Sequence, residues 1–279
     1  MPLVGFTSMH YPDRVFSYDE LLALLASSEN ITNFTPAMVQ KALQFKGQHP
    51  DALTATGLTG TCPREFRLRR SEPYTLELEQ LGYAFQAVTL REMLAQADPI
   101  PGTLRNVQLK KHLPIPPDNV WLPAQIDEVV TDYRPDSALI RAYKHTQRLP
   151  DRRGPYPLHR RELAIYRLLL SNFNGLAVTP DGTATFEALE AKYGEVVYLA
   201  GDQVRRYTFQ IDEPHYTMNW LGTLLYTFQN DFVSYADAVD EQAWGFHWKC
   251  GFCPVREQCF KLRVNDALQP KKAADPFEI

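Results

Sequence analysis

Three of the chain's four cysteines lie close together near its end, in the segment "KCGFCPVREQC". Cys250, Cys253 and Cys259 have the spacing C-x2-C-x5-C, and Cys62 lies far upstream. Four thiolates can hold a tetrahedral zinc ion or an iron–sulfur cluster. Zinc sites usually draw two close pairs of ligands, so the three-plus-one arrangement favours a cluster that Cys62 completes. The alternative is a buried Cys62 thiol beside an incidental triplet.

A second group of residues with possible chemistry lies in the middle of the chain, in "AQIDEVV" and "ALIRAYKHT". Asp127 stands at a polar position of an apolar strand, and Lys144 stands on the next strand. Carboxylates hold Mg²⁺ or Mn²⁺ in phosphodiester hydrolysis, and a nearby lysine can orient the attacking water and offset developing charge. An ordinary surface pair is the alternative interpretation.

The elements that must position these residues follow from hydrophobic periodicity. We expect helices, then a strand meander, a helix, a strand pair around Gly201-Asp202 and a last long helix. This order predicts a mixed α/β core with a helical wrapper, rather than regular βαβ alternation. The expected helices are 18–28, 36–45, a short basic one within 54–70, 75–94, 160–173 and one from 213 onward; the expected strands are 106–115, 124–130, 138–146 and a pair within 194–211.

Length and composition are those of one large globular domain, with 279 residues and 44% hydrophobic content. No apolar run reaches the length of a membrane span, and the N-terminus lacks the pattern of a signal peptide. We therefore expect a cytoplasmic protein, in which clustered cysteines are metal ligands first. The expected organisation is an N-terminal helical extension (1–50), a core (51–262) and a polar tail (263–279).

The formal net charge of −4 argues against general nucleic-acid binding, but it leaves room for a local basic groove. Arginines recur around the candidate motifs, and they suggest a groove for backbone phosphates. A solvated surface is the alternative for each group. The residues expected to contact nucleic acid are Arg64, Arg67, Arg148 and Arg160.

Together these features resemble the PD-(D/E)XK nuclease superfamily, in its RecB-like branch with an iron–sulfur cluster. The resemblance spans about residues 50–262. Its early cysteine segment matches "TATGLTGTCPREFRLRR", and its late C-x2-C-x5-C spacing is met position for position. The metal-binding Asp matches Asp127, and the lysine of (D/E)-x-K matches Lys144. In the family's Q-x-x-x-Y helix, Tyr166 is kept and Glu162 replaces Gln.

This resemblance implies a restriction-endonuclease-like mixed sheet core with flanking helices. Its N- and C-terminal parts would be joined by a [4Fe-4S] cluster on Cys62, Cys250, Cys253 and Cys259. It also implies a Mg²⁺- or Mn²⁺-dependent deoxyribonuclease, acting as an exonuclease on single-stranded DNA. Tyr166 would contact the DNA backbone or brace Lys144, unless it is simply a core residue. The chain lacks helicase motifs, so a helicase, CRISPR or phage recombination partner would be another chain.

The chain departs from the family pattern at several positions, and Ala124 stands where a Gly usually precedes the strand Asp. Ala142 stands where (D/E)-x-K has its acid, and no histidine follows Gly82 on the helix that usually carries one. Three origins of Ala142 remain open: a deliberate inactivating substitution, an acid that has moved elsewhere, or a natural loss of activity. The last would make the chain an inactive DNA-binding or adaptor protein, and a zinc-stabilised scaffold is a further alternative. The candidate substitute acids are Glu77, Glu79, Glu92, Glu128 and Glu162.

Overall fold

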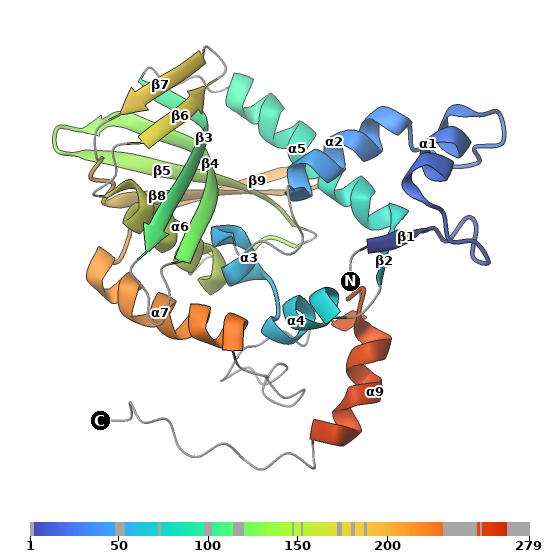
Figure 1. The fold of residues 1–279 in the computed structure, drawn as a ribbon. Coiled ribbons are helices and arrows are strands. Elements are labelled where there is room, and N and C mark those ends of the chain that lie inside the picture. Colours follow the sequence, from blue (N-terminus) through green and yellow to red (C-terminus); the bar gives the residue numbers. More distant parts are fainter. Residues whose placement is uncertain are drawn as a thin grey trace.

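A five-stranded mixed sheet lies at the centre of the structure, which is a computed structural model, and helices flank it (Figure 1). This arrangement confirms the mixed α/β class. The strand order is β3-β4-β5-β8-β9. The structure describes residues 3–47, 54–71, 74–97, 102–113, 120–146, 148–151, 153–171, 175–179, 182–186, 189–230, 250–251 and 253–266.

The sheet begins as an antiparallel meander and then changes direction. β3, β4 and β5 are successive neighbours, whereas β8 pairs with β5 in parallel. A parallel return requires a crossover, and the connection that contains helix α6 supplies it. β9 then pairs antiparallel with β8. The bounds are β3 (Thr103–Leu113), β4 (Val120–Arg134), β5 (Ser137–His145), α6 (Pro157–Leu170), β8 (Tyr193–Ala200) and β9 (Gln203–Gln210).

Helix α6 packs on one face of this sheet. Ile140, Ala142 and Val196 belong to the same buried cluster as Leu163 and Leu169 of the helix. Because strand side chains alternate between faces, these residues identify the face that α6 covers. Two further helices contact α6, namely α3 (Ala55–Gly60) and α7 (Pro214–Asn230), and Figure 1 shows α7 running below the sheet.

A second hydrophobic cluster combines the N-terminal segment with a late part of the chain. Phe6, Leu21 and Val39 pack in one cluster with Leu81 and Val255. Parallel pairing of β1 with β2 joins the first residues to positions 74–77. The elements around this cluster are β1 (Leu3–Thr7), α1 (Tyr18–Ala26), α2 (Pro36–Gly47), α4 (Pro63–Ser71), β2 (Tyr74–Glu77), α5 (Leu78–Ala97) and α9 (Arg256–Asp266).

Local chemistry explains where several helices begin. Ser17 and Glu20 form a reciprocal capping box at the start of α1. The Thr-rich segment forms two helices rather than one, because Thr54 caps α3 and Pro63 begins α4 after a break. Cys62 lies in that break. The second helix therefore starts directly after this cysteine.

Three features differ from the expected elements. The predicted helix 75–94 starts as strand β2, because its first residues pair with β1. The hairpin of β6 (Gly175–Thr179) and β7 (Gly182–Phe186) was not predicted. The expected continuation of the last long helix beyond 230 lies outside the described residues, as do positions 267–279. Within the described part of the chain, no helix is both long and apolar enough to cross a membrane.

Candidate active site

Asp127 and Ala142 occupy facing positions on β4 and β5. The strand register pairs Glu128 with Arg141, and one further step along it sets Asp127 opposite Ala142. Residues that face each other across an antiparallel pair point to the same side of the sheet. Asp127 Oδ2 accepts a hydrogen bond of 2.7 Å from the backbone N–H of Tyr143. Ala142 is buried and contributes only a methyl group, which cannot bind a metal.

Lys144 is ion-paired with Glu162 on this same face. Its Nζ lies 2.5 Å from Glu162 Oε2, and the two side chains are 17% and 1% exposed. Lys144 follows Ala142 by two positions on β5, so it shares the side of the sheet with Asp127. A cation and two carboxylates therefore lie on the sheet face that α6 covers.

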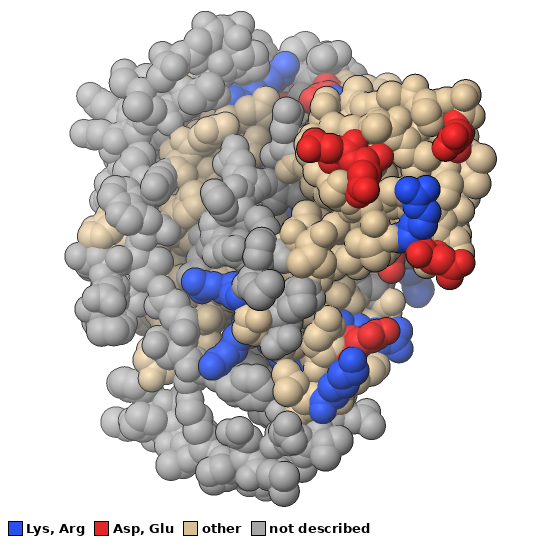
Figure 2. All heavy atoms as spheres, turned by 45° about the vertical axis from the view of Figure 1, so that its right-hand side comes forward, with Lys and Arg blue, Asp and Glu red and all other residues tan. Residues whose placement is uncertain are grey.

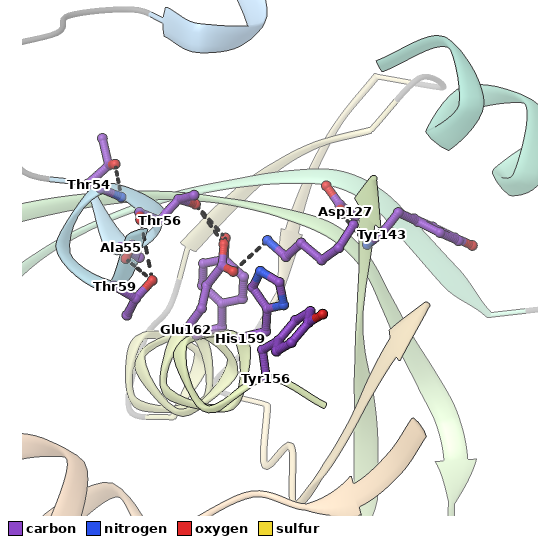
Figure 3. Close-up of polar contacts among 12 residues, drawn as sticks. Thr54, Ala55, Thr56, Thr59, Asp127, Tyr143, Tyr156, His159 and Glu162 are labelled. Carbon is purple, nitrogen blue, oxygen red and sulfur yellow. Dashed lines mark hydrogen bonds and ion pairs between the residues drawn. The ribbon is translucent and has the colours of Figure 1, made fainter. Parts of the chain in front are cut away.

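The second oxygen of the Glu162 carboxylate is held by two hydroxyl groups. Thr56 Oγ1 of α3 and the Tyr166 hydroxyl donate to Oε1 at 2.7 and 2.8 Å. Figure 3 shows Thr56 and Glu162 approaching each other from their two helices, with Asp127 across from them on the sheet. Glu162 is thus anchored from α3, α6 and β5 together. Tyr166 is buried and positions this carboxylate, so it does not lie on a surface that could contact DNA.

The electrostatics of these groups are coupled. Burial, the largest single influence, raises the pKa of Glu162, but the Lys144 ammonium, His159 and the hydrogen bonds from Lys144 and Thr56 together lower the pKa below its ordinary value. Burial raises the pKa of Tyr166 well above its usual range, and the negative charges of Glu162 and then Asp127 add to that rise. The charges of both carboxylates therefore influence the same buried phenol.

His159 is a member of this site that sequence reasoning missed. Its Nδ1 lies 2.7 Å from the Tyr198 hydroxyl of β8. Burial and then the Lys144 ammonium lower the pKa of the imidazole to about 3, so it is neutral near pH 7. The available signal was helical spacing, since His159, Glu162 and Tyr166 follow at i, i+3 and i+7 on one face of α6.

Strand β3 is distorted beside Asp127. Its register with β4 pairs Arg105 with Glu128 and Val107 with Ile126, which leaves Asn106 facing Asp127. Asn106 has φ of 51°, and it is the one non-glycine residue with positive φ in the described part of the chain. Asparagine tolerates this left-handed conformation better than most residues. The ladder is therefore interrupted at the position next to the carboxylate.

Glu128, one of the candidate substitute acids, points to the opposite face of the sheet. It accepts hydrogen bonds from Arg141 Nη1 and the Tyr143 hydroxyl, both at 3.0 Å. Arg141 Nε also donates to Glu195 at 2.7 Å, which joins β4, β5 and β8 through one buried charge network. Burial raises the pKa of Glu128. Its contacts and its face exclude it from the group around Lys144.

The candidate acids at the end of β2 and on α5 also have partners elsewhere. Glu77 accepts a hydrogen bond from Gln80, and Glu79 accepts one from Ser8. Glu92 forms an exposed ion pair with Lys41. Among the candidate substitutes in the described structure, Glu162 is the carboxylate that pairs with Lys144.

Two helices bring the distant cysteine segments together. Cys62 directly precedes α4, Cys259 lies on α9, and these helices contact each other. Arg64 Nε donates to Cys259 Sγ at 3.0 Å, and its Nη2 donates to the Cys259 carbonyl. Burial, with Glu65 next, raises the pKa of Cys253 to about 12, and Cys62 contributes to the same rise. None of the four cysteines is in a disulfide.

The residues present fit the expected cofactors in donor type, but their arrangement does not form a complete metal site. Within the described ranges, no three His, Cys, Asp or Glu side chains are placed to hold a metal ion. Four cysteines from adjoining segments suit a cluster, and Asp127 with Glu162 suits Mg²⁺, which commonly uses one or two protein carboxylates beside phosphate oxygens. The iron–sulfur joint between the two ends is thus an expectation, whereas the contact of α4 with α9 is observed.

The four arginines proposed for DNA binding fall into two groups. Arg64 is 1% exposed and braces Cys259, so the prediction that it contacts DNA is not supported by its position. Arg67, Arg148 and Arg160 are exposed. The Arg160 guanidinium lies 4.9 Å from the centre of the Phe209 ring. On the face drawn in Figure 2, the described Lys and Arg side chains stand in small, separate groups.

Comparisons with known proteins identify a class of fold rather than a family. No family pattern matches the chain, and no curated protein does. One solved structure has a similar fold. That structure is described as the crystal structure of SSO0001, and it is similar with a TM-score of 0.54 and 14% sequence identity. The match covers 80% of this chain and 94% of that chain. At this identity the similarity concerns the fold alone.

Proposed function

We propose that this chain is a metal-dependent deoxyribonuclease of the PD-(D/E)XK type, in which Glu162 supplies the acid that Ala142 lacks. The observation that carries the proposal is the buried ion pair of Lys144 with Glu162, on the face that also presents Asp127. Removing a cation and a carboxylate from water is costly unless the arrangement has a use or many supporting contacts. Perturbed ionisable groups of this kind cluster at functional sites.

The position of Glu162 favours a relocated acid over a natural loss of activity. Its carboxylate contacts the ammonium that the family motif places two residues after the acid. Three elements of the fold hold it there, through Thr56, Tyr166 and Lys144. A natural loss of activity offers no reason to keep such support, whereas an inactivating substitution at position 142 would leave these contacts unchanged and is separated from a relocated acid by the cleavage test.

Each residue of the proposed site has a role that its position suits. Asp127 and Glu162 would hold Mg²⁺ or Mn²⁺, together with oxygens of the substrate. When bound, the metal ion would lower the pKa of a coordinated water and offset phosphate charge. Lys144 would neutralise charge that develops on the phosphate, and Thr56 and Tyr166 would keep Glu162 oriented.

The cysteines are proposed to hold a structural [4Fe-4S] cluster. Cys62 and the Cys250–Cys259 segment would supply four thiolates at the contact between α4 and α9. When bound, such a cluster would add metal–ligand bonds across a long stretch of chain and so couple metal binding to folding. Arg64 would lie beside this group and offset its thiolate charge.

A non-enzymatic DNA-binding or adaptor protein with this fold is the second candidate. The observation that favours it is that both Glu162 oxygens already have protein partners. In that case the polar group around Lys144 would stabilise the fold or bind phosphate without hydrolysis. Metal-dependent cleavage separates the two candidates.

The experiment is a cleavage assay on 5′- and 3′-end-labelled single-stranded DNA, with Mg²⁺ or Mn²⁺ and with EDTA. We expect cleavage that needs the metal and falls at least about 100-fold in Asp127→Asn and in Lys144→Ala. Lys41→Ala is the matched control, because Lys41 also pairs with a glutamate, but on the surface. DNA binding without cleavage under every condition would favour the adaptor.

A further inference from the structure

A hydrogen-bond relay beside the proposed site fixes the position of one proton. The backbone N–H of Tyr156 donates to the Tyr198 hydroxyl at 2.9 Å. The same hydroxyl lies 2.7 Å from His159 Nδ1. Tyr198 is 0% exposed, so its own proton needs an acceptor within the protein.

His159 Nδ1 is the acceptor that this relay provides. A phenol that receives a backbone N–H still has one proton to donate. If Nδ1 carried a proton as well, two donors would face the Tyr198 oxygen and the buried phenol proton would lack a partner. Nδ1 is therefore unprotonated, and the proton of the neutral imidazole lies on Nε2.

The Nε2–H group has the location of a substrate donor. His159 precedes Glu162 by three positions, and Figure 3 shows both side chains on the same side of α6. Figure 3 draws the imidazole beside the Glu162 carboxylate, and the charges of Lys144 and Glu162 both act on it. Within the described residues, no protein acceptor takes a hydrogen bond from Nε2. It is thus a neutral donor beside a cation, a combination that suits an anionic oxygen.

We propose that His159 binds the substrate, donating its Nε2–H to a non-bridging oxygen of the phosphodiester that lies next to Lys144. This proposal rests on the proposed nuclease site. It assigns Tyr198 the task of positioning the imidazole and fixing its tautomer. It also excludes His159 as a general base, because Nε2 carries a proton and Nδ1 faces the phenol.

The tautomer can be measured without any activity. In protein labelled with ¹⁵N-histidine at pH 7, His159 should show a protonated Nε2 and an unprotonated Nδ1. Assignment comes from the signals that vanish in His159→Asn. Adding a single-stranded 20-mer in EDTA should shift the Nε2–H signal and slow its exchange with water. A proton on Nδ1, or an Nε2–H signal that the bound DNA leaves unchanged, would overturn the proposal.

Two substitutions separate a substrate donor from a structural residue. His159→Gln can place an amide N–H near the Nε2 position, whereas His159→Asn can keep only the contact with Tyr198. The proposal predicts that kcat/KM falls about 10- to 100-fold in His159→Asn and within about threefold in His159→Gln, although the Gln variant should be the less stable one. The reverse order of activities would show a structural role. The control is His215→Asn, whose ring lies on the exposed start of α7 against Tyr216.

Cleavage, DNA binding and the Nε2–H signal together distinguish a failure of the His159 proposal from a failure of the nuclease proposal. If the wild-type protein cleaves DNA and His159→Asn cleaves equally well, the nuclease stands and the role of His159 is wrong. If the wild type binds DNA without cleavage while the Nε2–H signal shifts, the phosphate donor stands and the nuclease is wrong. If the 20-mer does not bind, both are wrong.

Discussion

The Lys144 ammonium lies 2.5 Å from the Glu162 carboxylate, and this contact joins strand β5 to helix α6. The same carboxylate receives hydroxyl groups from Thr56 and Tyr166. Asp127 lies on the shared face of the sheet, opposite Ala142. In the proposed nuclease site, Glu162 would thus replace in space the acid that the (D/E)-x-K pattern lacks at Ala142.

Removing the Lys144 charge should destabilise the fold as well as stop cleavage. Lys144→Met leaves Glu162 buried without its cation, which we expect to cost about 3 kcal/mol in urea unfolding. Lys41→Met breaks an exposed ion pair and should cost less than about 1 kcal/mol. The double variant Lys144→Met/Glu162→Gln should recover stability but not activity. Equal stability of Lys144→Met and the wild type would contradict this account of the pair.

Acid should destabilise the protein through His159. Its pKa is lowered to about 3 in the fold, against about 6.5 in the unfolded chain, so only the unfolded chain gains this proton as the pH falls below 6.5. Stability associated with His159 is complete above pH 6.5 and is lost progressively toward pH 3. Between pH 7.5 and 5.0, His159→Gln should lose less stability than the wild type, by on the order of 1 kcal/mol in urea unfolding. Parallel pH profiles of the two proteins would contradict the buried neutral imidazole.

Metal and sulfide analysis tests the cysteines. Protein purified without oxygen should contain iron and acid-labile sulfide and should absorb visible light. Cys62→Ser should lose this absorption and unfold at a lower temperature, because it would free α4 from α9. Without the cluster, Cys253 should react slowly with iodoacetamide at pH 8, since its thiol has a pKa of about 12. Full iron content in Cys62→Ser, or zinc in place of iron, would contradict the four-cysteine cluster.

Replacing the exposed arginines should affect DNA binding, whereas replacing the buried arginine should affect stability. Each exposed arginine should contribute to DNA binding, so three variants are compared: Arg67→Ala, Arg148→Ala and Arg160→Ala. Each should weaken DNA binding and reduce the slope of log K against log salt concentration by about one, the change expected for one lost phosphate contact. Arg64→Ala should instead lower stability, because its guanidinium is buried against Cys259. Binding isotherms at several salt concentrations, with thermal unfolding of each variant, check both statements. A folded Arg64→Ala that has lost only DNA affinity would restore Arg64 to the binding surface.

The sheet that carries Asp127 and Lys144 was predictable, because two successive apolar segments indicate β4 and β5 as neighbouring strands of a meander. Strand register then decides which side chains share a face, and the structure supplies it. The start of β2 was not predictable from local pattern. Its residues continue a helical periodicity, but they pair with β1 from the far N-terminus.

The candidate site shows the same division between local and long-range information. The sequence indicated Asp127 and Lys144, and it left several acids open as the third member. Only the packing of α6 on the sheet selects Glu162 and brings His159 to Tyr198. The predicted DNA contact of Arg64 also depended on burial. An arginine in a basic helix is usually exposed, but Arg64 is buried. Such choices depend on tertiary contacts that no local pattern contains.

The most direct test of the central claim is Mn²⁺-dependent cleavage of end-labelled single-stranded DNA by three proteins. These are the wild type, Glu162→Gln, and Glu162→Gln combined with Ala142→Glu. We predict that the wild type cleaves, that Glu162→Gln is at least about 100-fold slower, and that Ala142→Glu restores part of the loss by returning a carboxylate beside Lys144. Full activity of Glu162→Gln would contradict the assignment of the acid. A wild type that never cleaves, with activity appearing only on Ala142→Glu, would show that Ala142 had inactivated the site.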